Sequence, residues 1–134
     1  MDFLNVNWLA IAAGALFNMV FGALWYGPIL GKSWMKLMGL NKEEIQKPSP
    51  AIFIVPAISA IIAAYVLNLF IHFFQVTHLL TGLGFGALLW TGFVATTSVT
   101  KSTFDDKNLG VWAIYAFYQL LVFGIEGAVF AIWQ

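Results

Sequence analysis

Charged residues divide this chain of 134 residues into three long apolar stretches separated by two polar segments. Residues 3–31 and 48–100 contain no Asp, Glu, Lys or Arg, and Glu126 is the one such residue within 108–134. A helix needs about 20 apolar residues to cross a bilayer. The first and last stretches therefore each suit one crossing, whereas the middle stretch is long enough for two.

The middle stretch has a natural break at the polar cluster Gln75, Thr77 and His78. We therefore predict four membrane-spanning helices, near residues 7–30, 52–74, 79–99 and 109–133. Strands of a membrane barrel would show strict alternation of apolar and polar residues, which segments such as 57–64 lack. The predicted fold is an all-α polytopic membrane protein, with four transmembrane helices in one antiparallel bundle over residues 1–134.

Composition agrees with this prediction and narrows the chemistry. Hydrophobic residues make up 61% of the chain and charged residues 9%, whereas a soluble domain has about 25% charged residues. The net charge is zero, so there is no electrostatic footprint for nucleic acid. Arg and Cys do not occur in the sequence, which excludes a bidentate arginine clamp, a thiolate metal site and a thiol nucleophile. The lipid bilayer is the expected partner, and no cofactor is expected.

The lysines predict the orientation in the membrane. All six lie between residues 32 and 47 or between 101 and 107, in the loops after the first and third spans. Lys and Arg are retained on the cytoplasmic side, so both termini are expected on the outer, periplasmic side. In the first of these loops Trp34, Leu37 and Met38 share one helical face, which predicts a short amphipathic segment on the inner leaflet.

The end of the first span carries a family resemblance. The segments Gly22–Pro28, Gly31–Met35 and Met38–Leu40 resemble a family of small bacterial membrane proteins catalogued as domain of unknown function 1761. The signature of that family, Gly-x-x-Trp-Tyr-x-Pro, corresponds here to Gly22, Trp25, Tyr26 and Pro28. The resemblance implies a multi-pass protein of the bacterial inner membrane, and it supplies no activity and no functional residues.

The same motif can be interpreted from its chemistry. Trp25, Tyr26 and Trp34 lie near the predicted cytoplasmic interface, where aromatic belts form. Pro28 can bend or end the helix there. The motif is thus either an interfacial anchor with a helix stop or, alternatively, a gate that contacts a substrate.

Small residues mark candidate packing faces on every span. Gly14, Asn18 and Gly22 recur every four residues on the first span, and Gly124 and Gly127 lie on the fourth. Small residues at such spacing let helices approach closely. The corresponding faces of the second and third spans are Ala57, Ala60, Ala64, Asn68 and His72, and Gly84, Leu88, Thr91, Ala95 and Ser98. Because four spans have few interior positions, we also expect a homo-oligomer.

Glu126 is the single acidic residue inside a predicted span. It shares a helical stripe with Tyr115 and Gln119, because residues four and seven apart lie on one face. Asn68, His72 and Asn18 reach comparable depths on neighbouring spans. A carboxyl group in a span is costly and is by default a functional hypothesis. These six residues are therefore the candidate proton or solute site. The alternative is a structural Glu126 that is hydrogen-bonded to Asn68, His72 or Gln119 and fixes helix packing.

His72 and His78 flank the outward turn between the second and third spans. They are weak candidates for metal ligands, because only Glu126 is available as a further partner. The alternative is that both histidines lie at the wet interface. The acid pair Asp105–Asp106 is predicted on the opposite side of the membrane from both histidines, which argues against a Ser-His-Asp arrangement. No enzymatic activity is expected.

Two classes of function remain. The first is an oligomeric transport or permeation protein with a proton or solute site around Glu126. The second is a non-catalytic scaffold or accessory subunit of a membrane complex. A hydrated cavity at the Glu126 face favours transport, whereas a dry, fully paired carboxyl favours the scaffold.

The distribution of the lysines predicts the outcome of reporter fusions. A reporter that works only in the periplasm should be active when it is fused after residue 134, and one that works only in the cytoplasm should be inactive. The reason is that both lysine loops are expected on the cytoplasmic side. Activities of alkaline phosphatase and green fluorescent protein fused at this point measure the difference. A cytoplasmic C-terminus would contradict the predicted topology.

Overall fold

The computed structural model describes residues 2–44, 48–105 and 108–134, and these residues contain helices and no strand. Four helical runs are long and apolar enough to cross a membrane. They are Trp8–Ile29, Ala51–Phe73, Leu79–Phe104 and Leu109–Ile132. The prediction of an all-α fold with four spans is confirmed, and the chain is a multi-pass membrane protein in its architecture.

The first span combines helix α1 (Trp8–Leu24) with the π-helical turn η1 (Trp25–Ile29). Helix α1 begins at Asn7, whose side-chain oxygen accepts a hydrogen bond of 2.9 Å from the backbone N–H of Ala10, as an N-cap does. In η1, which contains Pro28, the N–H of Leu30 donates to the carbonyl of Trp25, five residues back. The signature motif thus widens the helix into a π turn.

The amphipathic segment after this turn is helix α2 (Gly31–Met38), as predicted. It ends at Gly39, where φ is 68°, a left-handed conformation that favours glycine. A short 3₁₀ turn, η2 (Lys42–Glu44), follows. The second span is helix α3 (Ala51–Phe73).

The third span continues to Phe104, beyond its predicted end near residue 99. It consists of α4 (Leu79–Leu89), a second π-helical segment η3 (Trp90–Ala95), and α5 (Thr96–Phe104). Along α5 the threonine hydroxyls donate to backbone carbonyls one turn back, for example Thr100 to Thr96 at 2.8 Å. These bonds hide the hydroxyl groups against the backbone, so a polar sequence stays helical. The fourth span is α6 (Leu109–Ile132).

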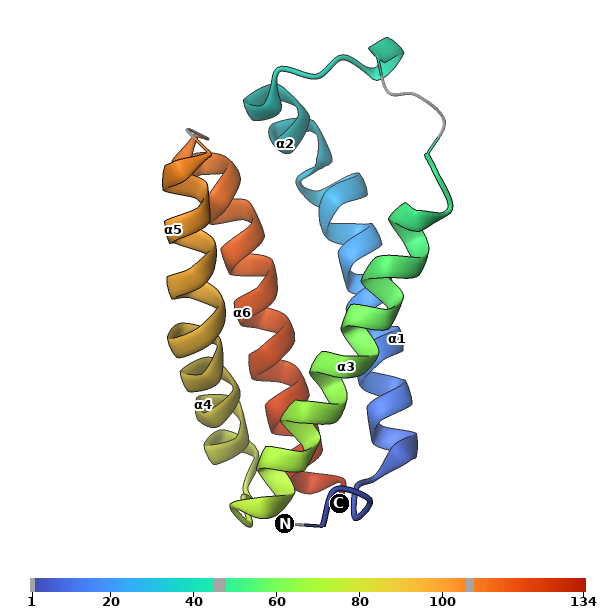
Figure 1. Ribbon diagram of the computed structural model, residues 1–134, viewed down its shortest axis with the longest axis vertical. Coiled ribbons are helices and arrows are strands. Elements are labelled where there is room, and N and C mark those ends of the chain that lie inside the picture. Colours follow the sequence, from blue (N-terminus) through green and yellow to red (C-terminus); the bar gives the residue numbers. More distant parts are fainter. Residues whose placement is uncertain (1, 45–47, 106–107) are drawn as a thin grey trace.

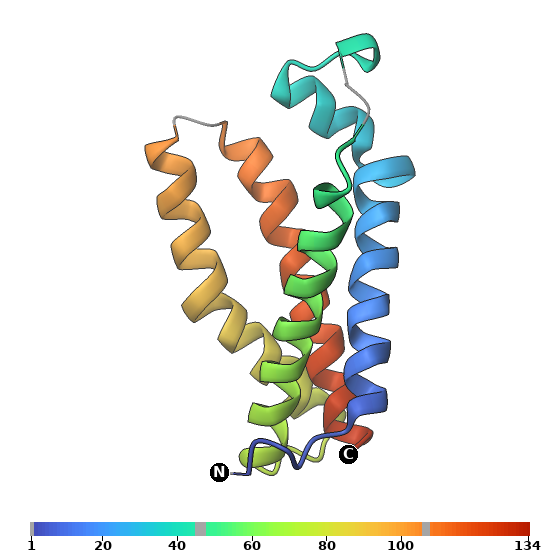
Figure 2. The same ribbon diagram turned by 45° about the vertical axis from the view of Figure 1, so that its right-hand side comes forward.

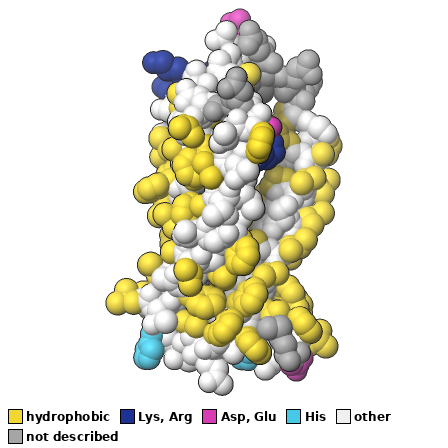
Figure 3. All heavy atoms as spheres, turned by 60° about the vertical axis from the view of Figure 1, so that its left-hand side comes forward, with side chains coloured by type: hydrophobic (Ala, Val, Ile, Leu, Met, Phe, Trp, Pro, Cys, Tyr) yellow, Lys and Arg dark blue, Asp and Glu magenta, His cyan; other side chains and the backbone are white. Residues whose placement is uncertain are grey.

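The four spans form an antiparallel bundle that is tight at one end and open at the other. Both termini lie at the end where the helices converge, and α2 lies at the end where they diverge (Figure 1). In the view of Figure 2 the third span leans away from α1 as it approaches this second end. Figure 3 shows hydrophobic side chains over the middle of the surface, with histidines at the terminal end and lysine at the opposite end.

The buried core lies in the terminal half of the bundle. It is formed by residues of α1, α3 and α6 and of the turn after α3, namely Ala10, Ile11, Ala64, Leu67, Ile71, Val76, Phe130 and Ala131. Ala10 on α1 and Ala64 on α3 are each 0% exposed, and such small residues let helices approach each other closely. The core therefore closes the bundle at the end that holds both termini.

Glycines bring α4 and α6 together in the same half. A Cβ on Gly82 would collide with the backbone of Gly127, and a Cβ on Gly86 would collide with the carbonyl of Phe123. Gly124 of α6 faces Leu83. The predicted packing face of the third span is wrong at Gly84 and Leu88: no described atom lies within 4 Å of a Cβ built on Gly84, and Leu88 is 66% exposed.

Hydrogen bonds across the terminal end connect the two ends of the chain to the bundle, and we call them the terminal cap. Asn7 donates from its backbone N–H to the Asn68 side chain at 3.3 Å and from its amide to the carbonyl of Trp133 at 3.2 Å. The Asn5 amide lies 3.0 Å from Nε2 of His72. The Gln134 amide donates to the carbonyl of Val76 at 2.8 Å.

The glycine contact predicts opposite effects for two substitutions in α4. Gly86→Ala should destabilise the protein by about 1–3 kcal/mol, because the new methyl group overpacks against the α6 backbone. Gly84→Ala should stabilise it by about 0.5–1 kcal/mol, because alanine is the better helix former and its methyl group meets open space. Thermal unfolding in detergent, followed by circular dichroism, measures both. Equal effects would contradict the close contact.

Candidate functional site

A cleft of about 640 Å³ opens in the half of the bundle away from the termini. All four spans contribute to its walls: α1 and η1 on one side, α3 opposite, and η3 and α6 between them. Its polar and aromatic lining residues are Asn18, Tyr26, Phe53, Ser59, Tyr115, Tyr118, Gln119 and Phe123. The cleft therefore brings together three of the six predicted site residues, Asn18, Tyr115 and Gln119.

Tyr118 joins α6 to α1 at the wall of the cleft. Its hydroxyl donates to the backbone carbonyl of Asn18 at 2.8 Å and also contacts the side-chain oxygen of that residue. A Cβ on Gly22 would lie 2.8 Å from the same hydroxyl. Gly22 therefore leaves room for the phenol. The Tyr118 side chain thus contacts both Gly22, a candidate packing residue, and Asn18, a candidate site residue.

The aromatic residues of the motif, Trp25 and Tyr26, are half-buried and contact other helices. The indole N–H of Trp25 donates to the carbonyl of Ile114 at 3.0 Å. The ring of Tyr26 lies edge-on to Tyr118 and to Trp34, with 5.8 Å between ring centroids in both pairs. The motif thus connects η1 with α2 and α6, and Tyr26 also lines the cleft.

Several polar groups of the cleft have no protein partner. Within the described residues, the side chains of Gln119, Tyr115, Tyr26 and Ser59 make no hydrogen bond. Among the residues that the structure describes, the lining of the cleft contains no charged side chain. An amide and three hydroxyls are therefore available to an uncharged ligand, which they can serve both as donors and as acceptors.

Glu126 lies in the packed terminal half and does not line the cleft. Its side chain turns inward, as predicted, and is 3% exposed. A Cβ on Gly14 would lie 3.5 Å from the carboxyl carbon of Glu126 and 2.7 Å from Cζ of Phe130. Gly14 therefore makes room on α1 for both side chains, in the manner expected of a packing glycine.

Three of the expected polar partners of Glu126 are engaged elsewhere, and the fourth, Gln119, lines the cleft. Asn18 bonds to Tyr118, Asn68 bonds to Asn7, and His72 bonds to Asn5. Oε1 of Glu126 is buried with no hydrogen-bond partner among the described residues. The structure thus separates the predicted set into the cleft residues, the terminal cap and an isolated carboxyl group.

Two cleft residues were missed from the sequence. Tyr118 precedes Gln119 by one residue, so it lies outside the strict stripe of Tyr115, Gln119 and Glu126. Ser59 was missed because it lies between the packing positions Ala57 and Ala60. Residues that line a cleft occupy a wider arc of each helix than residues at a contact between two helices. Lining residues therefore need not share one stripe.

The histidines do not form a metal site within the described part of the chain. Groups of three or more His, Cys, Asp or Glu side chains suited to a metal ion do not occur among these residues. His72 belongs to the terminal cap, and His78 is exposed just before α4.

Comparison with known proteins yields one finding. A family model described as "Protein of unknown function (DUF1761)" matches residues 9–131. The match confirms the resemblance drawn from the sequence and covers all four spans. No curated protein and no solved structure matches the chain.

The isolated carboxyl group predicts a gain in stability on substitution. Glu126→Met should stabilise the protein by about 1–3 kcal/mol, because an apolar side chain of similar length removes a buried polar group without a partner. Glu126→Gln keeps the shape and a polar end, and its melting temperature should stay near that of the wild type. Thermal unfolding in detergent measures both variants, and a lower melting temperature for Glu126→Met would contradict the observed lack of partners.

Proposed function

We propose that this chain, which belongs to the DUF1761 family of proteins of unknown function, is a membrane transport protein whose cleft binds a small neutral solute. The observation that carries the proposal is the cleft itself. Four spans line it, and the side chains of Gln119, Tyr115, Tyr26 and Ser59 in its wall have no hydrogen-bond partner among the described residues. Its volume of about 640 Å³ falls within the range of about 300–1,000 Å³ that is typical of small-molecule sites.

The chemistry of the lining supports a neutral solute. Aromatic rings provide apolar contact, and Gln119, Tyr115 and Tyr26 provide hydrogen bonds. A charged solute would lose its hydration without meeting an opposite charge, which is costly in a medium of low polarity.

The shape of the bundle supports binding from one side at a time. The cleft lies in the half away from the termini, and the core and the terminal cap close the other half. Transport requires a second state in which this end opens. The cap contributes single hydrogen bonds, each with a net contribution of about 0.5–1.5 kcal/mol, and opening also requires the helices around the core to separate.

Orientation and location follow from the lysines. We propose that the end with α2 faces the cytoplasm of a bacterium and that the terminal cap faces the periplasm, because lysines are retained inside. The observed state is then open toward the cytoplasm.

Glu126 has a structural role in this proposal. It lies seven residues beyond Gln119 on α6, about 10 Å along the helix axis, and it contacts α1 at Gly14. We therefore assign the solute site to Asn18, Tyr115 and Gln119 with Tyr118, and assign Glu126 to the packing of α6 on α1.

Access of water to the cleft provides the test, and the absence of native cysteine makes each introduced thiol unique. Gln119→Cys and Ser59→Cys should react with a membrane-impermeant methanethiosulfonate from the end with α2. They should also react from the terminal end, because a transporter visits both states. Labelling in intact cells and in inverted vesicles, read by mass spectrometry, compares the two sides.

Val122→Cys is the matched control, since Val122 lies one turn beyond Gln119 and is 0% exposed. It should stay unlabelled from either side. Reaction of the cleft cysteines from one side only would favour the accessory-subunit alternative, in which the cleft holds a ligand or a partner without moving it. Absence of reaction from both sides would contradict any aqueous access to the cleft.

A further inference from the structure

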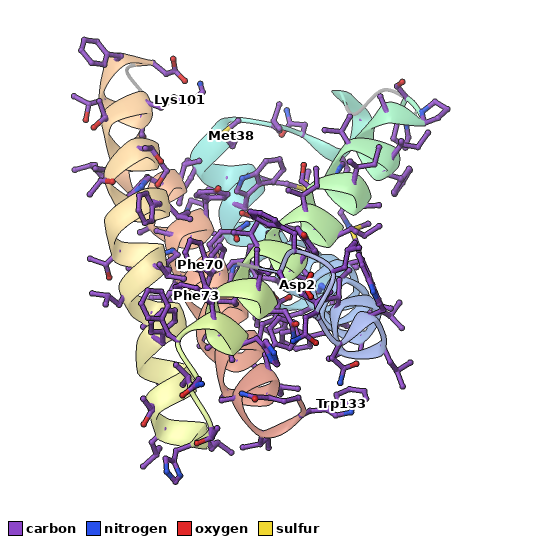
Figure 4. All side chains as sticks on the ribbon, turned by 60° about the horizontal axis from the view of Figure 1, so that its bottom comes forward. Asp2, Met38, Phe70, Phe73, Lys101 and Trp133 are labelled. Atoms are coloured by element: carbon purple, nitrogen blue, oxygen red, sulfur yellow. The ribbon has the colours of Figure 1, made fainter. Side chains whose placement is uncertain are left out.

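A second cavity adjoins the cleft on the side of α3 that faces the third span. It has a volume of about 390 Å³ and lies between α3, η3 and α6. We call it the furrow. Its lining is entirely apolar and consists of Ala63, Val66, Leu67, Phe70, Leu89, Phe93, Val94 and Phe123. Figure 4 labels Phe70 on α3, beside α6.

The furrow and the cleft meet at a common boundary. Ala63, Val94 and Phe123 line both cavities. The boundary exists because α3 packs much more loosely against the third span than against α1. A ligand in the cleft can therefore extend between these three residues into the furrow.

The position of this boundary places it in the hydrocarbon. Ala63 is close to the middle of α3 (Ala51–Phe73), about 18 Å from its first residue and about 15 Å from its last at 1.5 Å per residue. The hydrocarbon core is about 30 Å thick, so the furrow opens near the bilayer centre. A water-soluble molecule would have to leave water to pass there, whereas a molecule dissolved in the bilayer is already at that depth.

The cleft offers hydrogen-bonding groups and the furrow offers only apolar side chains, so a ligand that occupies both must be an amphiphile. The cleft has hydrogen-bonding groups without protein partners at Gln119, Tyr115 and Tyr26, and the furrow has none. In the described part of the chain, no charged residue lines either cavity. A charged headgroup would be left unpaired, at a high cost, whereas a hydroxyl or amide headgroup would be satisfied.

We propose that the solute of the cleft is a lipid-soluble amphiphile that enters from the bilayer. Its neutral headgroup binds among Gln119, Tyr115 and Tyr26, and its apolar chain lies in the furrow past Ala63 and Val94. This inference rests on the proposed solute site and specifies its ligand class. The furrow is then a lateral entrance, and the opening toward α2 serves the headgroup.

Photolabelling tests the ligand class directly. The probe is hexadecanol with a diazirine in its chain, added to vesicles of phosphatidylethanolamine and phosphatidylglycerol that contain the full-length protein. Hexadecanoic acid with the same diazirine is the charged counterpart. We expect hexadecanol to label the half-buried furrow residues Phe70 and Phe123, identified by mass spectrometry. The acid should label only outward-facing positions such as Phe93, which is 69% exposed.

Substitutions at the boundary make the test specific. Ala63→Trp should abolish furrow labelling by hexadecanol, because the indole fills the boundary. Val94→Trp fills the boundary from the third span and should abolish furrow labelling as well. Because the two substitutions lie on different helices, a folding defect in one variant would not explain the same result in both. Ala13→Trp is the matched control, because Ala13 is exposed on α1 and lines neither cavity. Its labelling should equal that of the wild type, and thermal unfolding confirms that all variants are folded.

Three results would overturn the inference. The first is equal furrow labelling in the wild type and both boundary variants, and the second is equal labelling by the alcohol and the acid. The third is crosslinking of Phe93 to a second copy of the chain, which would make the furrow an oligomer contact. If Gln119→Cys reacts with the aqueous reagent while hexadecanol fails to label, the solute site stands and the lipid-soluble ligand is wrong. Failure of both experiments contradicts the solute site as well.

Discussion

The approach of the α4 and α6 backbones is the contact on which the bundle depends. It requires glycine at positions 82, 86 and 127, because a Cβ at any of them would meet the facing backbone. Further along, large side chains separate the same two spans, including Trp112, whose indole N–H donates to Ser98 at 3.0 Å. Two helices that touch at one end and are held apart at the other must diverge. The separation of the third span from α6 at the end away from the termini is a consequence of this gradient in side-chain size.

The membrane explains why such a gradient can persist. In water an open cleft lined by phenylalanine and tyrosine would collapse, because burial of apolar surface drives compaction. In a bilayer the lipid chains are as apolar as the side chains, and this driving force between helices is absent. Packing of small residues and a few hydrogen bonds hold the spans together instead. The open half of the bundle is therefore compatible with a stable fold.

Most of the architecture could be predicted from the sequence. The positions of charged residues, with the polar cluster at Gln75, Thr77 and His78, were sufficient to predict four spans, since a charge is costly in hydrocarbon. The helical face of Trp34, Leu37 and Met38 was sufficient for α2. The glycine contact was not predicted, because small residues are common on every span and their spacing alone does not select Gly82 and Gly86 over Gly84.

The candidate site was predicted only in part, because the segment before α1 binds two of the predicted residues. Depth along the spans placed Asn68 and His72 near Glu126, but both are bound by Asn7 and Asn5 from the segment before α1. Hydropathy contains no information about how a polar segment folds back over a bundle. Asn18, Tyr115 and Gln119 do come together, because they lie on facing helices in the half where no such segment intervenes.

The π-helical segment η3 has a consequence for the register of the third span. In a regular α-helix each residue advances by about 100°, so Ser98 would lie about 120° away from Gly86 around the axis. One additional residue in the π turn reduces this angle to about 20°, and both residues face α6. Removing a single residue from Trp90–Ala95 would rotate everything beyond it by roughly a quarter turn. The length of this segment is therefore constrained independently of the identity of its side chains.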